Sequence, residues 1–372
     1  MTDSEIALFR TFPALARRLP RHPVLAAPAP VEPLLLPGFA EGSVWVKRDD
    51  RSCPLYGGNK PRKLEFVLGA ALARGARRLV TTGGLGTNHG LATTILGRHA
   101  SLATTLVLVH QPLTPGVQRA LLLHAAYGAR LVYGANVPGT ALQVLRVLAA
   151  STLRGERPFL VATGGSSRRG DAGFVSAALE LAEQVRAGAC PEPAEIYVPV
   201  GTGGTLAGLV AGLALTRLRS RVVGVLVTDI LQPSARSLAR AARAVLSWLR
   251  RLEPALPQAR VEPADFELAL GQLGAGYGAP TDAGRDAVAA AGACGLQLET
   301  TYTGKSLAEI LERRRRNALP SGPVLFWNTY NGVDVAARAP QALDPQALPP
   351  RFRGFLRGRP SDQSASGGTP AK

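Results

Sequence analysis

The chain has 372 residues, 46% hydrophobic and 19% charged, a balance typical of a globular protein with a substantial core, in one large domain or two of ordinary size. Its net charge of +17 would suit a polyanionic partner. However, the basic residues are scattered, and no helix-turn-helix, zinc-finger or RNA-recognition signature accompanies them. The composition therefore argues against nucleic-acid binding as the main function, and we expect no nucleic-acid partner.

Secondary structure is predicted from apolar runs and helical periodicity, taken in chain order. The first forty residues are rich in proline and predict an irregular surface arm. Apolar runs then predict strands at residues 43–48, 78–82, 105–109, 130–133, 159–162, 195–200, 222–227 and 324–327. Periodic segments predict helices at 60–74, 88–99, 116–127, 140–153, 170–187, 205–217, 234–251, 281–291 and 305–315. Strands separated by such helices are typical of βαβ units on a parallel sheet, so we expect an α/β fold.

Cysteine usage and hydropathy bear on the compartment. Cys53, Cys190 and Cys294 form no CxxC pair, which predicts neither a disulfide framework nor a metal site and fits a reducing cytosol. Residues 196–216 are long and uncharged enough to mimic a membrane span, but Pro199 and the following glycines divide them into strand, loop and helix. We therefore expect a cytoplasmic protein without a membrane partner.

Lysine is scarce in this chain, because arginine supplies almost all of the fixed positive charge. The lysines are Lys47, Lys60, Lys63, Lys305 and Lys372. An amine that can lose its proton can attack a carbonyl, whereas arginine stays protonated. The bias raises the chance that one of these lysines is a nucleophile, without choosing among them.

A glycine-rich loop follows the predicted strand at 195–200. It reads Gly201-Thr202-Gly203-Gly204-Thr205 and opens a helix, so its N–H groups and the helix dipole could hold a phosphate. It is not a P-loop, and Leu206 replaces the third glycine of a dinucleotide fingerprint, although Asp229 follows the next strand. A small phosphorylated cofactor is favoured, and a tight structural turn is the alternative.

Two further loops of this kind follow other predicted strands. Residues 83–89 read GGLGTNH, in which Thr87 would cap the next helix, and Thr87 and Asn88 could bind a carboxylate or a phenolic oxygen. Residues 164–167 read GGSS. Loops at the carboxyl ends of parallel strands bind ligands, so the three loops could converge on one site.

Several motifs together carry a resemblance to a known family. They read VWVKRDD (44–50), LYGGNKPRKLEF (55–66), TTGGLGTNHG (81–90), TGGSSRRGDAGFVSAALELAEQV (163–185), VPVGTGGTLAGL (198–209), GYGAPTDAG (276–284) and TYTGKSLAEI (301–310). In this order they resemble the D-cysteine desulfhydrase and 1-aminocyclopropane-1-carboxylate (ACC) deaminase family over residues 12–335. Members of that family are pyridoxal phosphate (PLP) enzymes of the tryptophan-synthase-β fold type, fold type II.

The resemblance implies an α/β architecture of two domains, each with three layers around an open twisted sheet. The large, PLP-binding domain would comprise residues 1–62 and 165–350, and the small domain residues 63–164. Residues 351–372 would be a disordered tail. Family members are commonly dimers, so a homodimer is expected.

The resemblance also implies roles for residues around the cofactor. Lys60 would carry PLP as a Schiff base, Asn88 would face its phenolic oxygen, and residues 201–205 would cradle its phosphate. Thr329 would lie near the pyridine nitrogen, where a hydroxyl leaves the ring a weaker electron sink than a carboxylate would. Such a ring suits loss of an α-proton followed by loss of a β-substituent.

On the substrate side, the resemblance points to Thr87, Tyr277 and Tyr302. Thr87 would hold the carboxylate and relay a proton, in place of the family's serine. Without the family, each tyrosine would be taken for a packed or half-exposed aromatic, and Lys47, Lys63 and Lys305 for surface cations. The chain also has NTYN at 328–331 where the family has His-Thr-Gly-Gly. Both departures bear on the substrate more than on the cofactor.

The predicted activity is α,β-elimination on a small amino acid. Thr303 and Thr329 resemble the desulfhydrases rather than the ACC deaminases, which have Glu and Leu at these places. This favours D-cysteine, giving pyruvate, ammonia and sulfide. ACC deamination, another PLP-dependent lyase or racemase activity, and a PLP- or nucleic-acid-binding protein with little turnover are the alternatives.

Overall fold

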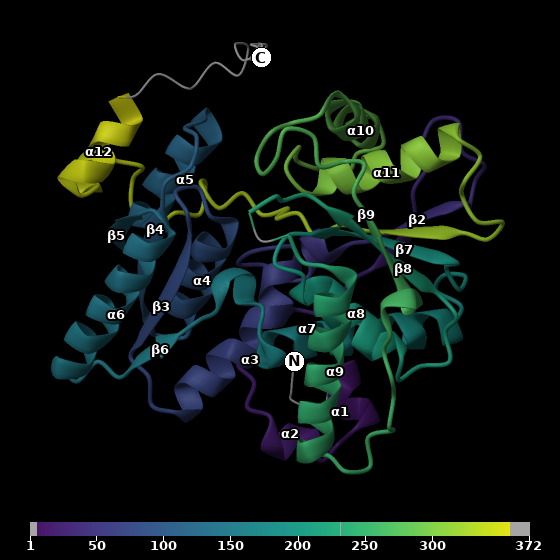
Figure 1. Cartoon of the computed structure of the whole chain (residues 1–372), viewed down its shortest axis with the longest axis horizontal. Helices are drawn as coiled ribbons and strands as arrows, with labels where there is room; N and C mark the ends of the chain where they lie inside the picture. The colour runs from purple at the N-terminus through teal and green to yellow at the C-terminus, as the bar shows by residue number, and fades with distance from the viewer. Residues whose placement is uncertain (1–5, 231, 358–372) are drawn as a thin grey trace, which may run out of the picture. The chain divides into compact units, whose positions relative to one another are not determined.

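The computed structural model describes residues 6–230 and 232–357 of the chain (Figure 1). These residues divide into two compact units. Residues 6–75, 162–230 and 232–333 form the larger unit, and residues 76–161 and 334–357 form the smaller unit. This division differs from the expected one at both boundaries. Residues 63–75 and 162–164 were expected in the small domain and belong to the larger unit, whereas residues 334–350 were expected in the large domain and belong to the smaller unit.

The larger unit holds a six-stranded sheet with helices on both faces. Its strands are β1 (Val31–Pro33), β2 (Val44–Lys47), β7 (Glu195–Val200), β8 (Arg221–Leu226), β9 (Phe266–Ala269) and β10 (Val324–Trp327). Its helices are α1 (Ala7–Thr11), α2 (Leu15–Arg18), α3 (Asn59–Ala73), α7 (Arg168–Arg186), α8 (Gly204–Leu213), α9 (Ala235–Leu252), α10 (Asp282–Ala293) and α11 (Thr303–Arg315). The predicted strand–helix alternation is therefore present in this unit.

The strand order in this sheet is β1-β2-β10-β7-β8-β9. Only β1 is antiparallel to its neighbour, and β10 pairs in parallel with both β2 and β7. Successive side chains of a strand point to opposite faces, and both faces of this sheet are buried. Ile196 and Val198 pack in the cluster with α7, α8 and α9, whereas Tyr197 packs in the cluster with α10 and α11.

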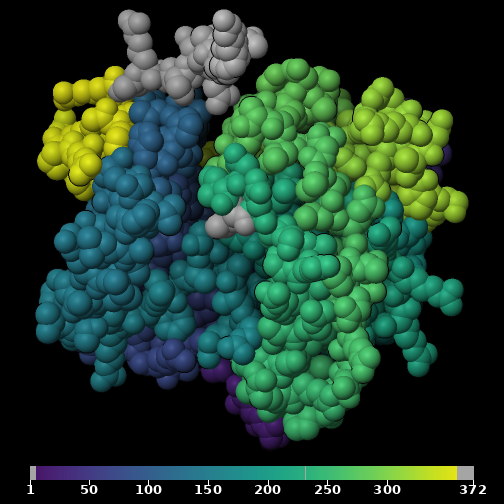
Figure 2. Space-filling model, viewed as in Figure 1, coloured from purple at the N-terminus to yellow at the C-terminus, as the bar shows by residue number. Residues whose placement is uncertain are grey.

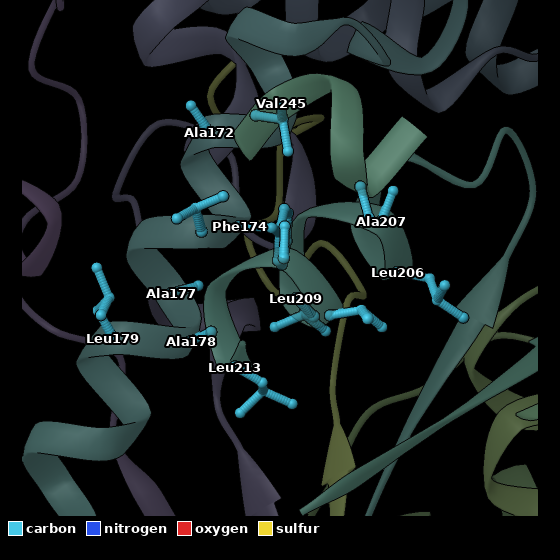
Figure 3. Packing of buried hydrophobic residues seen from close by; sticks show 14 of the residues in the cluster. Ala172, Phe174, Ala177, Ala178, Leu179, Leu206, Ala207, Leu209, Leu213 and Val245 are labelled. Atoms are coloured by element: carbon cyan, nitrogen blue, oxygen red, sulfur yellow. The ribbon is translucent and has the colours of Figure 1, made fainter. Parts of the chain in front are cut away.

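Small residues let the helices on the first of these faces pack closely. Figure 3 shows Ala177 and Ala178 of α7 beside Leu209 and Leu213 of α8. A Cβ atom added at Gly212 would lie 2.6 Å from the Cβ of Ala178, so glycine is needed for this approach. The tight α7–α8 pair supports the loop that precedes α8.

The smaller unit is a parallel four-stranded sheet in the order β5-β4-β3-β6. Its elements are β3 (Arg78–Gly84), β4 (Ala103–Val109), β5 (Arg130–Ala135), β6 (Pro158–Leu160), α4 (Asn88–His99), α5 (Pro115–Ala126), α6 (Val137–Leu153) and α12 (Pro350–Arg357). Leu106 and Leu108 pack with α5 and α12 on one face, and Val107 packs against α6 on the other.

Residues 350–357 correct the expectation of a disordered tail from 351. They form α12, whose Phe352 is only 2% exposed and meets the ring of Tyr133 edge-on at 6.2 Å. Figure 2 shows α12 (yellow) on the surface of the smaller unit beside α5 (blue). The tail was predicted from its Ser/Gly/Pro content, which lies mainly in residues 358–372, outside the described residues.

Other short elements were missed. The proline-rich arm contains α1, α2 and β1, and β9 lies in a stretch for which no strand was predicted. These elements span three to five residues, too few to show periodicity. Within residues 6–230 and 232–357, no helix is both long enough and apolar enough to cross a membrane.

Candidate active site

In the larger unit, the predicted site residues follow the carboxyl ends of neighbouring parallel strands. Lys60 comes after β2, Thr329 after β10, the loop 201–205 after β7, and Tyr277 after β9. Because these strands run in parallel, their carboxyl ends share one edge of the sheet, where α/β proteins bind ligands. The topology thus gathers these residues at one edge.

Two glycines dock the start of α3 against the segment that follows β10. Gly58 has a φ of +81°, and a Cβ atom there would lie 2.3 Å from the carbonyl oxygen of Thr329. A Cβ atom at Gly57 would lie 2.1 Å from the carbonyl oxygen of Asp50. Neither position has room for a side chain, so the glycines before Lys60 fix where α3 begins.

The amine of Lys60 is poised to react with a carbonyl. It makes no hydrogen bond or ion pair with any residue that the structure describes. Burial lowers the pKa of Lys60 to about 7, and the nearby charge of Lys63 acts in the same direction. About half of this amine is therefore neutral, and so nucleophilic, at neutral pH.

The loop 201–205 opens α8 and has the geometry of an anion cradle. Gly203 adopts a left-handed conformation with φ of +87°, and Thr205 accepts a hydrogen bond from Asn59 Nδ2 at 3.1 Å. The first N–H groups of α8 have no partner within the helix, and they lie at the positive end of its dipole. The hydrogen bond from Asn59 links this cradle to the residue next to Lys60.

A cation and two hydroxyl groups lie behind the cradle. Lys63 Nζ donates to Ser166 Oγ at 3.1 Å, and Ser166 Oγ lies 2.6 Å from Thr202 Oγ1. The carboxylate of Asp171 lies 4.0 Å from Lys63 Nζ, and its pKa is raised to about 7 by burial, against the effect of Lys63. A Cβ atom at Gly204 would lie 2.9 Å from Lys63 Nζ, so this amine is close to the loop. Two of the three predicted loops, 164–167 and 201–205, are thus brought together.

Tyr277 and Tyr302 form a hydrogen-bonded pair. Their hydroxyl oxygens lie 2.8 Å apart, and the rings meet edge-on with centroids 5.9 Å apart. Burial raises the pKa of both phenols, so both stay protonated at neutral pH. A Cβ atom at Gly201 would lie 3.4 Å from the Tyr302 ring, which places the pair beside the cradle.

The segment that departs from the family pattern, 328–331, packs against the start of α3. Asn331 Oδ1 accepts a hydrogen bond from the Gly57 N–H at 2.7 Å. Asn328 is fully buried, and its Nδ2 has no hydrogen-bond partner among the described residues. The Thr329 hydroxyl likewise makes no hydrogen bond within the described part of the chain. These two polar groups are available to a bound molecule.

The remaining predicted residues, Thr87 and Asn88, belong to the smaller unit. Thr87 caps α4, as expected, by accepting a hydrogen bond from the Gly90 N–H at 3.2 Å. Asn88 is the first residue of α4 and is exposed. Both follow the carboxyl end of β3, at the ligand-binding edge of their own sheet.

The expectation that Lys47, Lys63 and Lys305 are surface cations is wrong, because all three are buried. Lys47 Nζ donates to Glu180 Oε1 at 2.6 Å and to the Ala29 carbonyl oxygen at 2.7 Å. Lysine is usually exposed, and no local pattern indicates the partners that allow its burial. Some of the few lysines in this chain therefore form buried contacts within the fold, in addition to the one expected to react.

Sequence reasoning also missed residues that shape the site. Ser166 was seen only as part of a loop, and Glu299 was not singled out, although it accepts hydrogen bonds from three N–H groups at the start of α11. Tyr56 is buried, and its high pKa reflects burial together with Tyr330 and Glu299 nearby. A carboxylate shortly before a helix is a capping signal that could have identified Glu299.

The donor set fits PLP. Lys60 supplies an amine for the aldehyde, the 201–205 cradle with Lys63 and Ser166 behind it suits a phosphate, and Thr329 has a free hydroxyl for a ring nitrogen. Within the described ranges, no cluster of three His, Cys, Asp or Glu side chains could hold a metal ion. The site is therefore equipped for an organic phosphate with a reactive carbonyl.

Comparison with known proteins agrees with this chemistry. A family model described as pyridoxal-phosphate dependent enzyme matches residues 25–329. Nocardicin C-9′ epimerase of Nocardia uniformis subsp. tsuyamanensis is 36% identical over 84% of this chain and 92% of its own length. D-cysteine desulfhydrase of Salmonella paratyphi C is 31% identical over 87% of this chain and 97% of its own.

Among solved structures, an ACC deaminase homologue superposes with a TM-score of 0.71 at 28% identity. The superposition covers 87% of this chain and 94% of the homologue.

Proposed function

The chain belongs to the family of pyridoxal-phosphate dependent enzymes, and we propose that it catalyses α,β-elimination on a small amino acid such as D-cysteine. The products would be pyruvate, ammonia and, from cysteine, sulfide. The observation that carries the proposal is the Lys60 amine, which has no hydrogen-bond or ion-pair partner among the described residues and has a pKa of about 7. Lys60 also lies beyond the same edge of the sheet as the phosphate cradle.

When bound, PLP withdraws electrons from the substrate's Cα–H bond and makes its proton acidic. Lys60 Nζ, once released from the cofactor, accepts this proton. A pKa near 7 suits this general base, because the amine is then partly neutral at the working pH. Elimination would then leave the electron pair of the Cβ–S bond on sulfur, and water would convert the remaining carbon skeleton to pyruvate and ammonia.

The tyrosine pair supplies protons at the substrate side. Tyr302 donates to Tyr277, so the Tyr277 hydroxyl hydrogen is available to another acceptor. Both phenols are protonated at neutral pH because burial raises their pKa. We assign Tyr277 to protonate the leaving thiolate, with Tyr302 holding it in place.

Thr303 and Thr329 favour a desulfhydrase-like substrate over ACC. Thr303 Oγ1 accepts a hydrogen bond from the Glu299 N–H at 3.1 Å and lies within hydrogen-bonding distance of Glu299 oxygens. Its hydroxyl is thus bonded to Glu299, the residue whose carboxylate accepts the N–H groups at the start of α11. Thr329 is left as the neutral partner for the pyridine nitrogen, which suits loss of a good β-leaving group.

Two residues of the smaller unit, Asn88 and Thr87, would also contact the cofactor and the substrate. Asn88 would be the partner of the phenolic oxygen of PLP, and Thr87, with the 83–88 loop, would bind the substrate carboxylate. Thr87 also serves as a cap through its hydroxyl oxygen, which leaves the hydroxyl hydrogen to donate. Apart from Tyr302, which precedes α11, the residues used in each unit follow the carboxyl ends of parallel strands.

A second candidate function is epimerisation of an amino-acid centre. It is favoured by the 36% identity to a protein named nocardicin C-9′ epimerase, which exceeds the 31% identity to the D-cysteine desulfhydrase. Both reactions begin with removal of the Cα proton, so Lys60 would serve either. Epimerisation needs a second proton donor on the opposite face of Cα, for which Thr87 is the candidate.

Purified protein tests the proposal in two steps. First, visible absorbance should be lost on borohydride treatment, and the mass of the PLP adduct should appear on the peptide that contains Lys60. Second, D- and L-amino acids should be incubated with the enzyme in deuterated water. Release of pyruvate and sulfide supports elimination; deuterium at Cα with inversion and no pyruvate supports epimerisation instead. Loaded protein that does neither contradicts both.

We also propose a cytoplasmic homodimer. The dimer rests on the family resemblance, and the compartment on the three cysteines, none of which is paired among the described residues. Sedimentation of the PLP-loaded protein tests the dimer: a species of 38.9 kDa, the mass of one chain, would contradict it.

A further inference from the structure

Each tyrosine of the hydrogen-bonded pair is held through its backbone by a carboxylate. The Tyr302 N–H donates to Glu299 Oε1 at 2.9 Å, and the Tyr277 N–H donates to Asp229 Oδ1 at 2.9 Å. Glu299 precedes α11, whereas Asp229 follows β8. The two halves of the pair therefore depend on two separate anchors from distant parts of the sequence.

Lys305 connects these anchors. Its side chain is 0% exposed, and its Nζ donates to the carbonyl oxygens of Leu273 at 2.7 Å and Gly276 at 3.4 Å. Both carbonyls belong to the turn that presents Tyr277. Glu299 and Asp229 both attract the Lys305 ammonium electrostatically and oppose the desolvation that lowers its pKa. The buried ammonium is thus hydrogen-bonded to the turn, and both carboxylates attract it without forming an ion pair with it among the described residues.

The turn needs such anchors because its own sequence does not fix it. Gly274, Gly276 and Gly278 all have positive φ values, of +63°, +118° and +79°. Glycine backbones have many accessible conformations, so ordering this turn costs more entropy than ordering other residues would. At Gly276 a Cβ atom would lie 2.7 Å from Asp229 Oδ2, so the carboxylate contacts the turn closely.

We propose that Lys305 is a positioning residue which, with Asp229 and Glu299, sets the distance between the Tyr277 and Tyr302 hydroxyls. Lys305 donates no hydrogen bond to either phenol among the described contacts. It acts through the backbone of the turn and through the two carboxylates. The effect on catalysis rests on the proposed function, because Tyr277 is assigned there to the leaving group. The effect on the conformation of the turn does not depend on the proposed function.

This role also explains why lysine stands at 305 in a chain that otherwise uses arginine. An ammonium is a compact group whose three donors can reach two carbonyl oxygens in a closed space. A guanidinium is larger and planar, and it would have to be accommodated at a position with no exposure. The proposal therefore predicts that Lys305→Arg does not restore the wild-type site.

Amide hydrogen exchange tests the positioning role without any substrate. In PLP-loaded Lys305→Met, exchange in peptides covering 273–278 and 299–303 should speed up by about tenfold or more, since both segments lose a buried charged partner. Ser306→Ala is the matched control, because Ser306 is the next residue of α11, fully buried, and its Oγ has no partner among the described residues. Unchanged exchange in a loaded Lys305→Met protein would overturn the proposal, as would an equal increase in Ser306→Ala.

A double-mutant cycle tests the catalytic consequence. Lys305→Met should lower kcat by about tenfold to a hundredfold in the wild-type background, but by less than about threefold once Tyr277→Phe has removed the hydroxyl that it positions. Equal effects in the two backgrounds would show a general structural role and overturn this part. If Lys305→Met does not fold, Asp229→Asn enters the same cycle with the same expectation. Loaded wild-type protein that turns over no substrate contradicts the proposed function, and the exchange experiment still decides the positioning role.

Discussion

His124 of α5 should make the smaller unit sensitive to acid. Its imidazole is fully buried, and burial lowers its pKa from 6.5 to about 4, against a weaker opposing contact with the Leu85 backbone. The folded state therefore favours the neutral ring more strongly than the unfolded chain does. The free energy of unfolding is therefore unaffected by this group above about pH 6.5, and it decreases as the pH falls from 6.5 to about 4. At about 1.4 kcal/mol per tenfold change in proton affinity, the loss is about 2 kcal/mol at pH 5 and about 3 kcal/mol at pH 4.

The variant His124→Leu removes the titrating group while keeping an apolar side chain of similar size. We expect its smaller unit to lose about 2 kcal/mol less than the wild type between pH 7.5 and pH 5. Urea unfolding of this unit can be followed by amide exchange in peptides from β4. Trp45, Trp248 and Trp327 all lie in the larger unit, so tryptophan fluorescence reports that unit separately and should show no effect of the variant. Parallel pH profiles of the two proteins in the β4 peptides would refute the reasoning.

Three further predictions follow from the site and from α12. The rate at which the apoprotein binds PLP, measured by stopped-flow absorbance, should rise with pH and level off just above pH 7, because the pKa of Lys60 is about 7. A rate that keeps rising to pH 10 would contradict this. In fluorescence titration, Gly204→Ala should weaken PLP binding by about tenfold or more, because the added Cβ atom would lie 2.2 Å from Asp171 Oδ1. The control variant Gly292→Ala should leave PLP affinity unchanged, because no atom lies within 4 Å of the added Cβ. Phe352→Ala should destabilise the smaller unit by about 3 kcal/mol in urea, and no change would mean that α12 contributes nothing to its core.

Much of the fold could be predicted from the sequence because its signals are local. The strand at 195–200 has the observed limits of β7, and the helix at 88–99 has those of α4. Both have a clear apolar pattern and a glycine-rich loop beside them. In contrast, β9 spans four residues and its partner β8 is distant in sequence, so nothing nearby indicates it.

The candidate site was predicted only in part, for a similar reason. Lys60 and the 201–205 loop stand out because each depends on neighbouring glycines. The bond between Tyr277 and Tyr302 spans 25 residues, and the two carboxylates that hold these tyrosines lie in different elements. No local pattern brings such groups together, because sheet order and helix packing decide which of them meet. The burial of Lys305 was missed for the same reason.

The place of β10 in the sheet has a consequence for how the protein is made. Its residues, 324–327, leave the ribosome after all other strands that the structure describes, yet β10 lies between β2 and β7. Until it arrives, β2 has no partner that joins it to the strands from β7 onward, and the Thr329 carbonyl that meets Gly58 does not yet exist. The lysine that would hold the cofactor is synthesised early, but its surroundings are complete only after residue 329 has been added. Nascent chains shorter than about 330 residues should therefore be unable to retain PLP, even if their other strands and helices have already folded.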